Sequence, residues 1–221
     1  MPDQIPLFPL SAVLYPGGTL PLHVFEERYR LLVERLMGLP DGSPRSFGVV
    51  AIRVGRESGT DGVTALHEIG CAADLREVKA YEDGRYDIVT TGSRRFHLLE
   101  VDTSEPYLQG DVRWLDEPSG DAAGLLTAAV LERFAGYRDA LHSLGLRGGG
   151  GDLPRDPHLL SYLVATAMVL DLADHQALLA APDTASRLSL ELDLLRRESA
   201  LLTHLPSLPG IDYARQPAPP N

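Results

Sequence analysis

Apolar and polar residues follow two different patterns along the chain. Up to about residue 115, apolar residues come in short runs separated by glycine, proline and Asp-Gly, as in "FGVVAIRVGRE" (residues 47–57) and "YLQGDVRWL" (residues 107–115). From about residue 120 they recur every three to four positions. Short runs between turn residues are typical of strands, and the longer repeat is typical of amphipathic helices. Strands followed by helices predict an α+β architecture.

The beginning of the chain mixes prolines with apolar residues. The stretch "IPLFPLSAVLYPGGTLPLHVFEERYRLLVERLM" (residues 5–37) contains four prolines and a Gly-Gly pair. Because proline has no N–H to donate to a sheet, we expect strand edges here, with Pro16-Gly17-Gly18 as a turn between two strands. A helix should follow, and its apolar face comprises Phe25, Tyr29, Leu32, Val33 and Leu36.

Further turn and helix signals lie downstream. Glu82-Asp83-Gly84 predicts a hairpin, and four helices are expected beyond residue 120. The clearest helix start is Asp156, an N-cap residue followed by Pro157. The pattern divides the chain into a β-rich domain (residues 1–118), a helical domain (119–205) and a flexible proline-rich tail (206–221).

Charge and cysteine content narrow the functional classes. The formal net charge is −11 with a pI near 5.0, which disfavours nucleic acid because phosphate contacts are made mainly by lysine and arginine. The only cysteine, Cys71, excludes an intrachain disulfide and a cysteine-based zinc site. Without a signal-like or membrane-length apolar stretch, the protein is expected in the cytoplasm and not in a membrane.

Short motifs suggest little catalytic chemistry. "HEIGC" at His67 has Cys71 where a zinc-protease motif needs its second histidine, so a structural role is expected. Arg94-Arg95 is interpreted as a solvated strand end with one structural arginine, although an acidic or nucleic-acid ligand is the alternative. No metal, cofactor or catalytic group is predicted.

Three segments resemble the N-terminal, substrate-binding domain of ATP-dependent Lon proteases. They are the opening stretch above, "LHEIGCAADLREVKAYEDGRYDIVTTGSRRFHL" (residues 66–98) with Gly70, Gly84, Gly92 and Arg95 at family-like positions, and "DHQALLAAPDTASRLSLELDLLRRE" (residues 174–198). The likeness covers about Ile5 to Leu205. It implies a PUA-like β pseudo-barrel followed by a C-terminal helical bundle, and a stand-alone bacterial member of the family.

The resemblance also implies a function in which the chain binds polypeptides without cleaving them. Lys79 is the only lysine and follows Val78, so neither a phosphate-binding loop nor the Ser-Lys pair of Lon proteolysis is present in this sequence. We expect no enzyme activity, but binding of unfolded or partner polypeptides, as a proteolysis adaptor for a partner protease or as a chaperone-like module. The alternative is an RNA-binding module, because PUA-like barrels in other families bind RNA. The sequence leaves homo-oligomers open.

By resemblance, the substrate-binding candidates are Phe25, Glu26, Glu27, Arg28 and Tyr29, at the corner where the second strand turns into the first helix. The three charged residues are expected on the solvated face of the helix, which makes them the better candidates. For Phe25 and Tyr29, packing in the core is the expected role.

Overall fold

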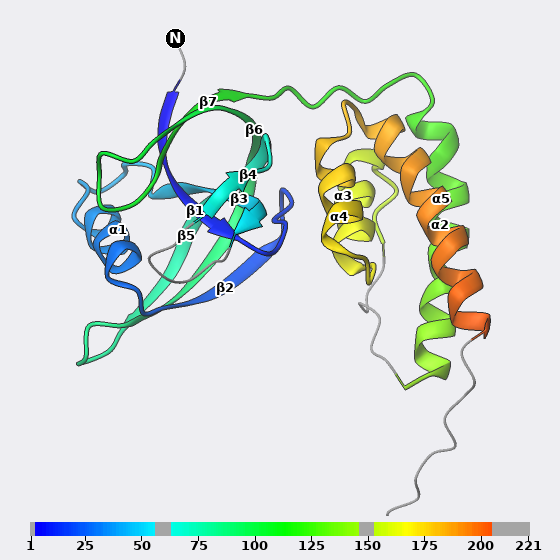
Figure 1. Cartoon of the computed structure of the whole chain (residues 1–221). Coiled ribbons are helices and arrows are strands. Elements are labelled where there is room, and N and C mark those ends of the chain that lie inside the picture. The colour runs from blue at the N-terminus through cyan, green and yellow to red at the C-terminus, as the bar shows by residue number, and fades with distance from the viewer. Residues whose placement is uncertain (1–2, 56–62, 146–152, 205–221) are drawn as a thin grey trace, which may run out of the picture.

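The computed structural model describes residues 3–55, 63–145 and 153–204 (Figure 1). Within these ranges the elements are β1 (Asp3–Leu10), β2 (Thr19–Val24), α1 (Glu27–Met37), β3 (Ser46–Gly55), β4 (Val63–Leu66), β5 (Ile69–Ala80), β6 (Tyr86–Asp102), β7 (Gln109–Trp114), α2 (Ala123–Ser143), α3 (Pro157–Ala167), α4 (Leu172–Ala180) and α5 (Thr184–His204). Strands precede the packed helices, with α1 as the single early helix in the described part of the chain. The predicted α+β class is confirmed.

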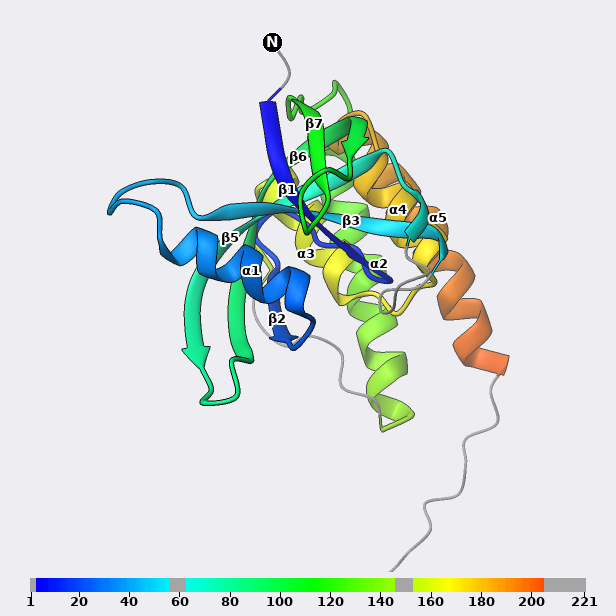
Figure 2. The same ribbon diagram turned by 60° about the vertical axis from the view of Figure 1, so that its left-hand side comes forward.

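The sheet closes on itself as a pseudo-barrel (Figure 2). Its strands follow the order β1-β7-β6-β5-β3, and β1 also pairs with β3 in parallel, from Leu7↔Gly48 to Leu10↔Ala51. β1 joins both ends of this order because it changes partner along its length, pairing with β7 over Asp3–Pro6 and with β3 afterwards. β2 pairs with β6, and β4 pairs with β3, outside this ring.

Both predicted turns are present. At the first, the Gly18 N–H donates to the Tyr15 carbonyl at 2.9 Å, and Gly17 has a φ of 78°, a conformation that glycine adopts at no steric cost. At the second, β5 and β6 form a hairpin in which Gly84 has a φ of 79°. The turn residues of the sequence therefore set these two chain reversals locally.

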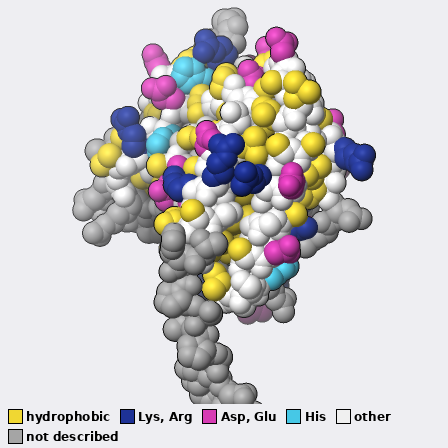
Figure 3. Space-filling model, turned by 90° about the vertical axis from the view of Figure 1, so that its right-hand side faces the viewer, with side chains coloured by type: hydrophobic (Ala, Val, Ile, Leu, Met, Phe, Trp, Pro, Cys, Tyr) yellow, Lys and Arg dark blue, Asp and Glu magenta, His cyan; other side chains and the backbone are white. Residues whose placement is uncertain are grey.

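The helical part has its own apolar core. This cluster draws on α2, α3, α4 and α5, and Tyr15 from the segment after β1 packs into it. The predicted start of α3 is confirmed, because the Asp156 side chain accepts a hydrogen bond from the Leu159 N–H at 2.8 Å. On the outer face of the helices, positive and negative side chains lie interspersed (Figure 3). None of the described helices is long and apolar enough to cross a bilayer.

A buried group of polar side chains joins the barrel to the helices. Arg95 on β6 is 1% exposed, and its Nη1 donates to the carbonyls of Leu179 and Ala181 at 2.6 and 2.7 Å. Its Nε donates to Glu117 at 2.6 Å. The prediction of one structural arginine in the Arg94-Arg95 pair is confirmed for Arg95, but its place is not a solvated strand end.

Glu117 has further interaction partners in this buried polar group. It accepts a hydrogen bond from the Tyr162 hydroxyl at 2.8 Å, and Arg187 of α5 lies 3.7 Å from it. Arg187 is fully buried and donates to Ser161 at 3.0 Å. One carboxylate on the connection between β7 and α2 therefore links a barrel strand to two helices.

The predicted tail lies outside the described residues. The division into domains at residue 118 stays a prediction.

Candidate functional site

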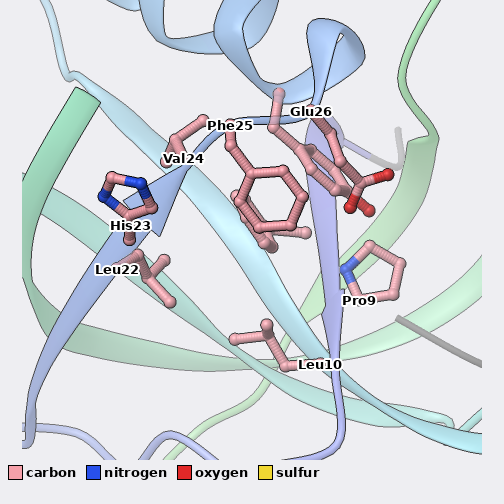
Figure 4. Close-up of a pocket in the computed structure, with 9 residues that line it drawn as sticks. Pro9, Leu10, Leu22, His23, Val24, Phe25 and Glu26 are labelled. Carbon is pink, nitrogen blue, oxygen red and sulfur yellow. The ribbon is translucent and has the colours of Figure 1, made fainter. Parts of the chain in front are cut away.

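A small pocket opens between β1 and β2, at the corner where the candidate residues lie (Figure 4). Its volume is about 130 Å³, and its lining residues are Phe8, Pro9, Leu10, Leu22, His23, Val24, Phe25, Glu26 and Tyr29. Three of the five predicted site residues, Phe25, Glu26 and Tyr29, are in this lining. The lining is mainly apolar, with His23, Glu26 and Tyr29 as the members that carry ionisable groups.

The pocket exists because β1 and β2 do not pair with each other in the described sheet. From Leu7 to Leu10, β1 pairs with β3, while β2 pairs with β6 along its whole length. Pro9 and Leu10 of β1 and residues 22–24 of β2 line the pocket. In the view of Figure 4, Leu10 lies at the bottom and Val24 at the upper left, with the Phe25 ring between them.

Tyr29 has the core role expected for it. Its side chain is 4% exposed, and its ring stacks on Phe8 with 3.9 Å between ring centroids. This stacked aromatic pair from β1 and α1 therefore forms part of the pocket lining.

Phe25 does not have the core role expected for it. It is 54% exposed, and Figure 4 shows its ring lying across the pocket. The prediction was wrong because α1 begins at Glu27 and Glu26 is extended, with φ −70° and ψ 136°. Phe25 therefore precedes the helix, and the helical repeat does not determine which way its side chain points.

The three charged candidates differ in their surroundings. Glu26 and Arg28 form an ion pair at 2.9 Å, and the Arg28 guanidinium lies 4.6 Å from the centre of the Tyr29 ring. Both side chains are partly buried, so the expectation of a solvated face holds fully only for Glu27. Glu27 lies in the first turn of α1, where a carboxylate interacts favourably with the helix dipole.

Sequence reasoning missed a polar group at the rim of the pocket. His23 on β2 lies 2.6 Å from the Asp87 carboxylate on β6, and the Tyr81 hydroxyl donates to the same carboxylate. These hydrogen bonds lower the pKa of Asp87, and the one with His23 has the largest effect. The two residues are directly opposite in the β2–β6 register. The pairing of His23 with Asp87 follows from this strand register, and a single sequence does not specify the register.

Cys71 is buried in the core, and burial raises the pKa of its thiol to about 12, so it is not a reactive thiolate. Among residues 3–55, 63–145 and 153–204, no group of three or more His, Cys, Asp or Glu side chains is placed to hold a metal ion. The pocket offers an exposed aromatic ring, apolar walls and a polar rim.

Comparison with known proteins relates the chain to a family. The family model described as the ATP-dependent protease La (LON) substrate-binding domain matches residues 4–197. The chain is 25% identical over 197 residues to Lon protease 2 of Syntrophobacter fumaroxidans, which covers 85% of this chain and 24% of that protein. It is 28% identical over 215 residues to Lon protease 2 of Sorangium cellulosum, covering 90% of this chain and 25% of that protein. The chain thus spans about a quarter of the length of these relatives.

Solved structures agree with the sequence match. The crystal structure of a Lon N-terminal domain protein from Xanthomonas campestris superposes with a TM-score of 0.60 at 25% identity, covering 92% of this chain and 99% of that one. The N-terminal domain of a Mycobacterium avium complex Lon protease has a TM-score of 0.61 at 18% identity, and covers 92% of this chain and 100% of that one. The second likeness concerns the fold alone.

Proposed function

The chain belongs to the family of Lon substrate-binding domains, and from this membership we propose that it binds unfolded or partner polypeptides in the pocket between β1 and β2. The observation that carries the proposal is Phe25. A phenylalanine ring that is 54% exposed over apolar walls leaves surface in water that a bound apolar side chain would cover.

The site has the features of a groove for an extended chain. In this proposal, main-chain groups of β1 and β2 beside the pocket pair with the bound segment, and the pocket takes one apolar side chain at a time. Glu26 and Glu27 at the start of α1 favour segments with basic residues close to the apolar one.

The proposed role is capture without cleavage. The 221 residues match the substrate-binding part of relatives named Lon protease, and they lack a lysine after glycine as a phosphate-binding loop requires. Bound polypeptides would then pass to a partner protease, which makes the protein an adaptor, or be held and released, which makes it chaperone-like.

The test is a fluorescent, permanently unfolded polypeptide titrated with the protein. We expect a Kd in the micromolar range and a weakening of about tenfold or more for Phe25→Ala, because a fully buried phenylalanine side chain contributes roughly 1.5–3 kcal/mol. Leu125→Ala is the matched control, since Leu125 on α2 is 83% exposed and lies outside the pocket lining. Equal affinities of the Phe25 variant and the wild type would disprove this site.

The salt dependence of the affinity distinguishes polypeptide binding from RNA binding. Polypeptide binding through apolar contacts should change by less than about tenfold between low salt and ~0.5 M salt. RNA binding should be weaker and should fall steeply with salt, because phosphate contacts release counterions. Tighter binding of RNA than of the polypeptide at physiological salt would reverse the assignment. Glu26→Lys/Glu27→Lys should shift selectivity toward acidic segments.

A further inference from the structure

A second groove lies at another edge of the sheet. It has a volume of about 300 Å³ and lies between the segment Ala65–Glu68 and the end of β6, with Leu108 also in its lining. Leu99 and Val101 are 46% and 42% exposed there. The groove shares no lining residue with the pocket around Phe25.

Unpaired strand edges border this groove. In the described sheet β4 pairs only with β3, and β6 pairs only with β7 beyond His97, where its pairing with β5 ends. The two edges approach each other at one point, where the Leu98 N–H donates to the Glu68 carbonyl at 2.7 Å.

The direction of the main chain shows which groups face the groove. The His67 N–H donates to Ala51 of β3 at 2.9 Å, whereas the Glu68 carbonyl accepts from β6. Because main-chain groups alternate in direction along an extended segment, the N–H and C=O of Leu66 point to the same side as Glu68, away from β3. They have no main-chain hydrogen-bond partner among the described residues, so an added strand can pair with them.

The charges in the groove lining favour some extended segments over others. Its lining contains two carboxylates, Glu68 and Glu100, and neither lysine nor arginine. His97 lies 3.5 Å from Glu68. His67 adds little positive charge at neutral pH, since burial and the nearby Arg53 lower its pKa. A segment with a basic side chain next to apolar ones is therefore complementary to this surface.

We propose that this groove is a second polypeptide-binding site, where an extended segment of alternating apolar residues with one lysine or arginine adds as a strand to the free edge of β4. Its main chain pairs with Leu66, its apolar side chains cover Leu99 and Val101, and its basic residue meets Glu68 or Glu100. Strand addition combines main-chain hydrogen bonds, which give affinity, with side-chain contacts at alternate positions, which give selectivity.

The probe is a labelled seven-residue peptide, acetyl-Thr-Val-Lys-Val-Thr-Val-Thr-amide, followed by fluorescence anisotropy. Two analogues carry N-methyl groups, one at its valines and the other at its threonines and lysine, so that each blocks one edge of the peptide. We expect one analogue to lose about tenfold or more in affinity, because the edge that faces β4 can no longer donate. If both analogues bind like the parent peptide, strand addition is wrong.

Charge reversal tests the place of binding. Glu68→Lys/Glu100→Lys should weaken the lysine peptide by about fivefold or more and favour a peptide with glutamate instead of lysine. Glu77→Lys, an exposed glutamate on β5 outside the groove lining, is the matched control and should leave both affinities nearly unchanged. An equal effect of the control and the double variant would overturn the groove as the site.

The Phe25→Ala variant separates this inference from the proposed function. It should bind the peptide like the wild type, because Phe25 is not part of the groove. Loss of peptide binding in Phe25→Ala would place the peptide at the first pocket and contradict the second site, while leaving the proposed function intact. If Phe25→Ala binds both the peptide and the unfolded polypeptide like the wild type, the second site stands and the proposed function at the first pocket fails.

Discussion

Arg95 is a buried charged residue between the barrel and the helices. An unpaired ion at such a place would lower the free energy of unfolding by several kcal/mol. Its Nε and Nη2 donate to the two carboxylate oxygens of Glu117, and its Nη1 donates to the carbonyls of Leu179, in the last turn of α4, and of Ala181, which follows α4. A guanidinium fits this place because its planar fork can reach a carboxylate and two carbonyls at once.

We therefore expect Arg95→Ala to lower the free energy of unfolding by about 3–5 kcal/mol, because Glu117 and two carbonyls lose their donor. Urea unfolding gives the measurement. The neighbouring Arg94→Ala is the control and should cost less than about 1 kcal/mol, since Arg94 is exposed and only lies over the Trp114 ring. Similar costs for the two variants would contradict the buried role of Arg95.

Glu191 is the second buried ionisable residue with a measurable consequence. It is fully buried on α5, and neither carboxylate oxygen has a hydrogen-bond partner among the described residues. Burial raises the pKa of Glu191 well above its usual value, although the nearby Arg187 acts in the opposite direction. The folded protein therefore holds a proton that the unfolded chain releases at lower pH.

A folded-state pKa above the unfolded value means that stability falls as pH rises from the ordinary glutamate pKa to the raised one. Glu191→Gln should remove this loss, by about 1.4 kcal/mol for each pH unit between the two values. Urea unfolding of both proteins at pH 5 and pH 8 is the test, and we expect the variant to gain relative to the wild type at pH 8. A constant difference across pH would refute the raised pKa.

At the scale of elements, the turn after β1 is joined to β6 through Gly92. The Gly17 N–H donates to the Gly92 carbonyl and the Gly92 N–H donates to the Gly18 carbonyl, both at 2.8 Å. A Cβ at Gly92 would overlap the Tyr15 carbonyl oxygen, which belongs to the main chain and cannot rotate away. The glycine therefore permits close approach of the turn that leads from β1 into β2.

We expect Gly92→Ala to destabilise the protein by about 2 kcal/mol or more, through this overlap and the displaced hydrogen bonds. Gly136→Ala is the matched control. Gly136 lies within α2 with open space where its Cβ would be, so alanine should stabilise by up to ~1 kcal/mol through helix propensity. Thermal unfolding of both variants gives the signs, and destabilisation of equal size in both would show that the close approach at Gly92 does not matter.

At the scale of the whole molecule, the barrel and the helices share their buried polar contacts. Glu117 links β6 to α3, and the Gln176 side chain of α4 donates to the Ile69 carbonyl of β5 at 2.9 Å. Tyr15 packs into the helical core and donates to the His175 carbonyl at 2.9 Å. Unfolding either part would expose buried polar groups of the other.

We therefore expect one cooperative unfolding transition rather than two. Trp114, the only tryptophan, is on β7 and reports on the barrel, whereas circular dichroism at 222 nm reports mainly on the helices. The urea transitions from the two signals should coincide. Separate midpoints would instead support independent folding of the two predicted domains.

The sequence by itself determined the order and type of the elements. Turns at Pro16-Gly17-Gly18 and near Gly84, and the cap at Asp156, depend on the conformations of a few neighbouring residues. Apolar repeats identified the helices because a helix must bury one face.

Only the tertiary structure decided which distant groups meet. β1 closes the sheet by changing partner, His23 lies opposite Asp87 through the β2–β6 register, and Arg95 reaches carbonyls more than 80 positions away along the chain. Phe25 is exposed because α1 starts two residues later, at a boundary that helical periodicity does not define. Such contacts depend on strand register and on how the helices pack on the barrel, and local propensity contains no information about either.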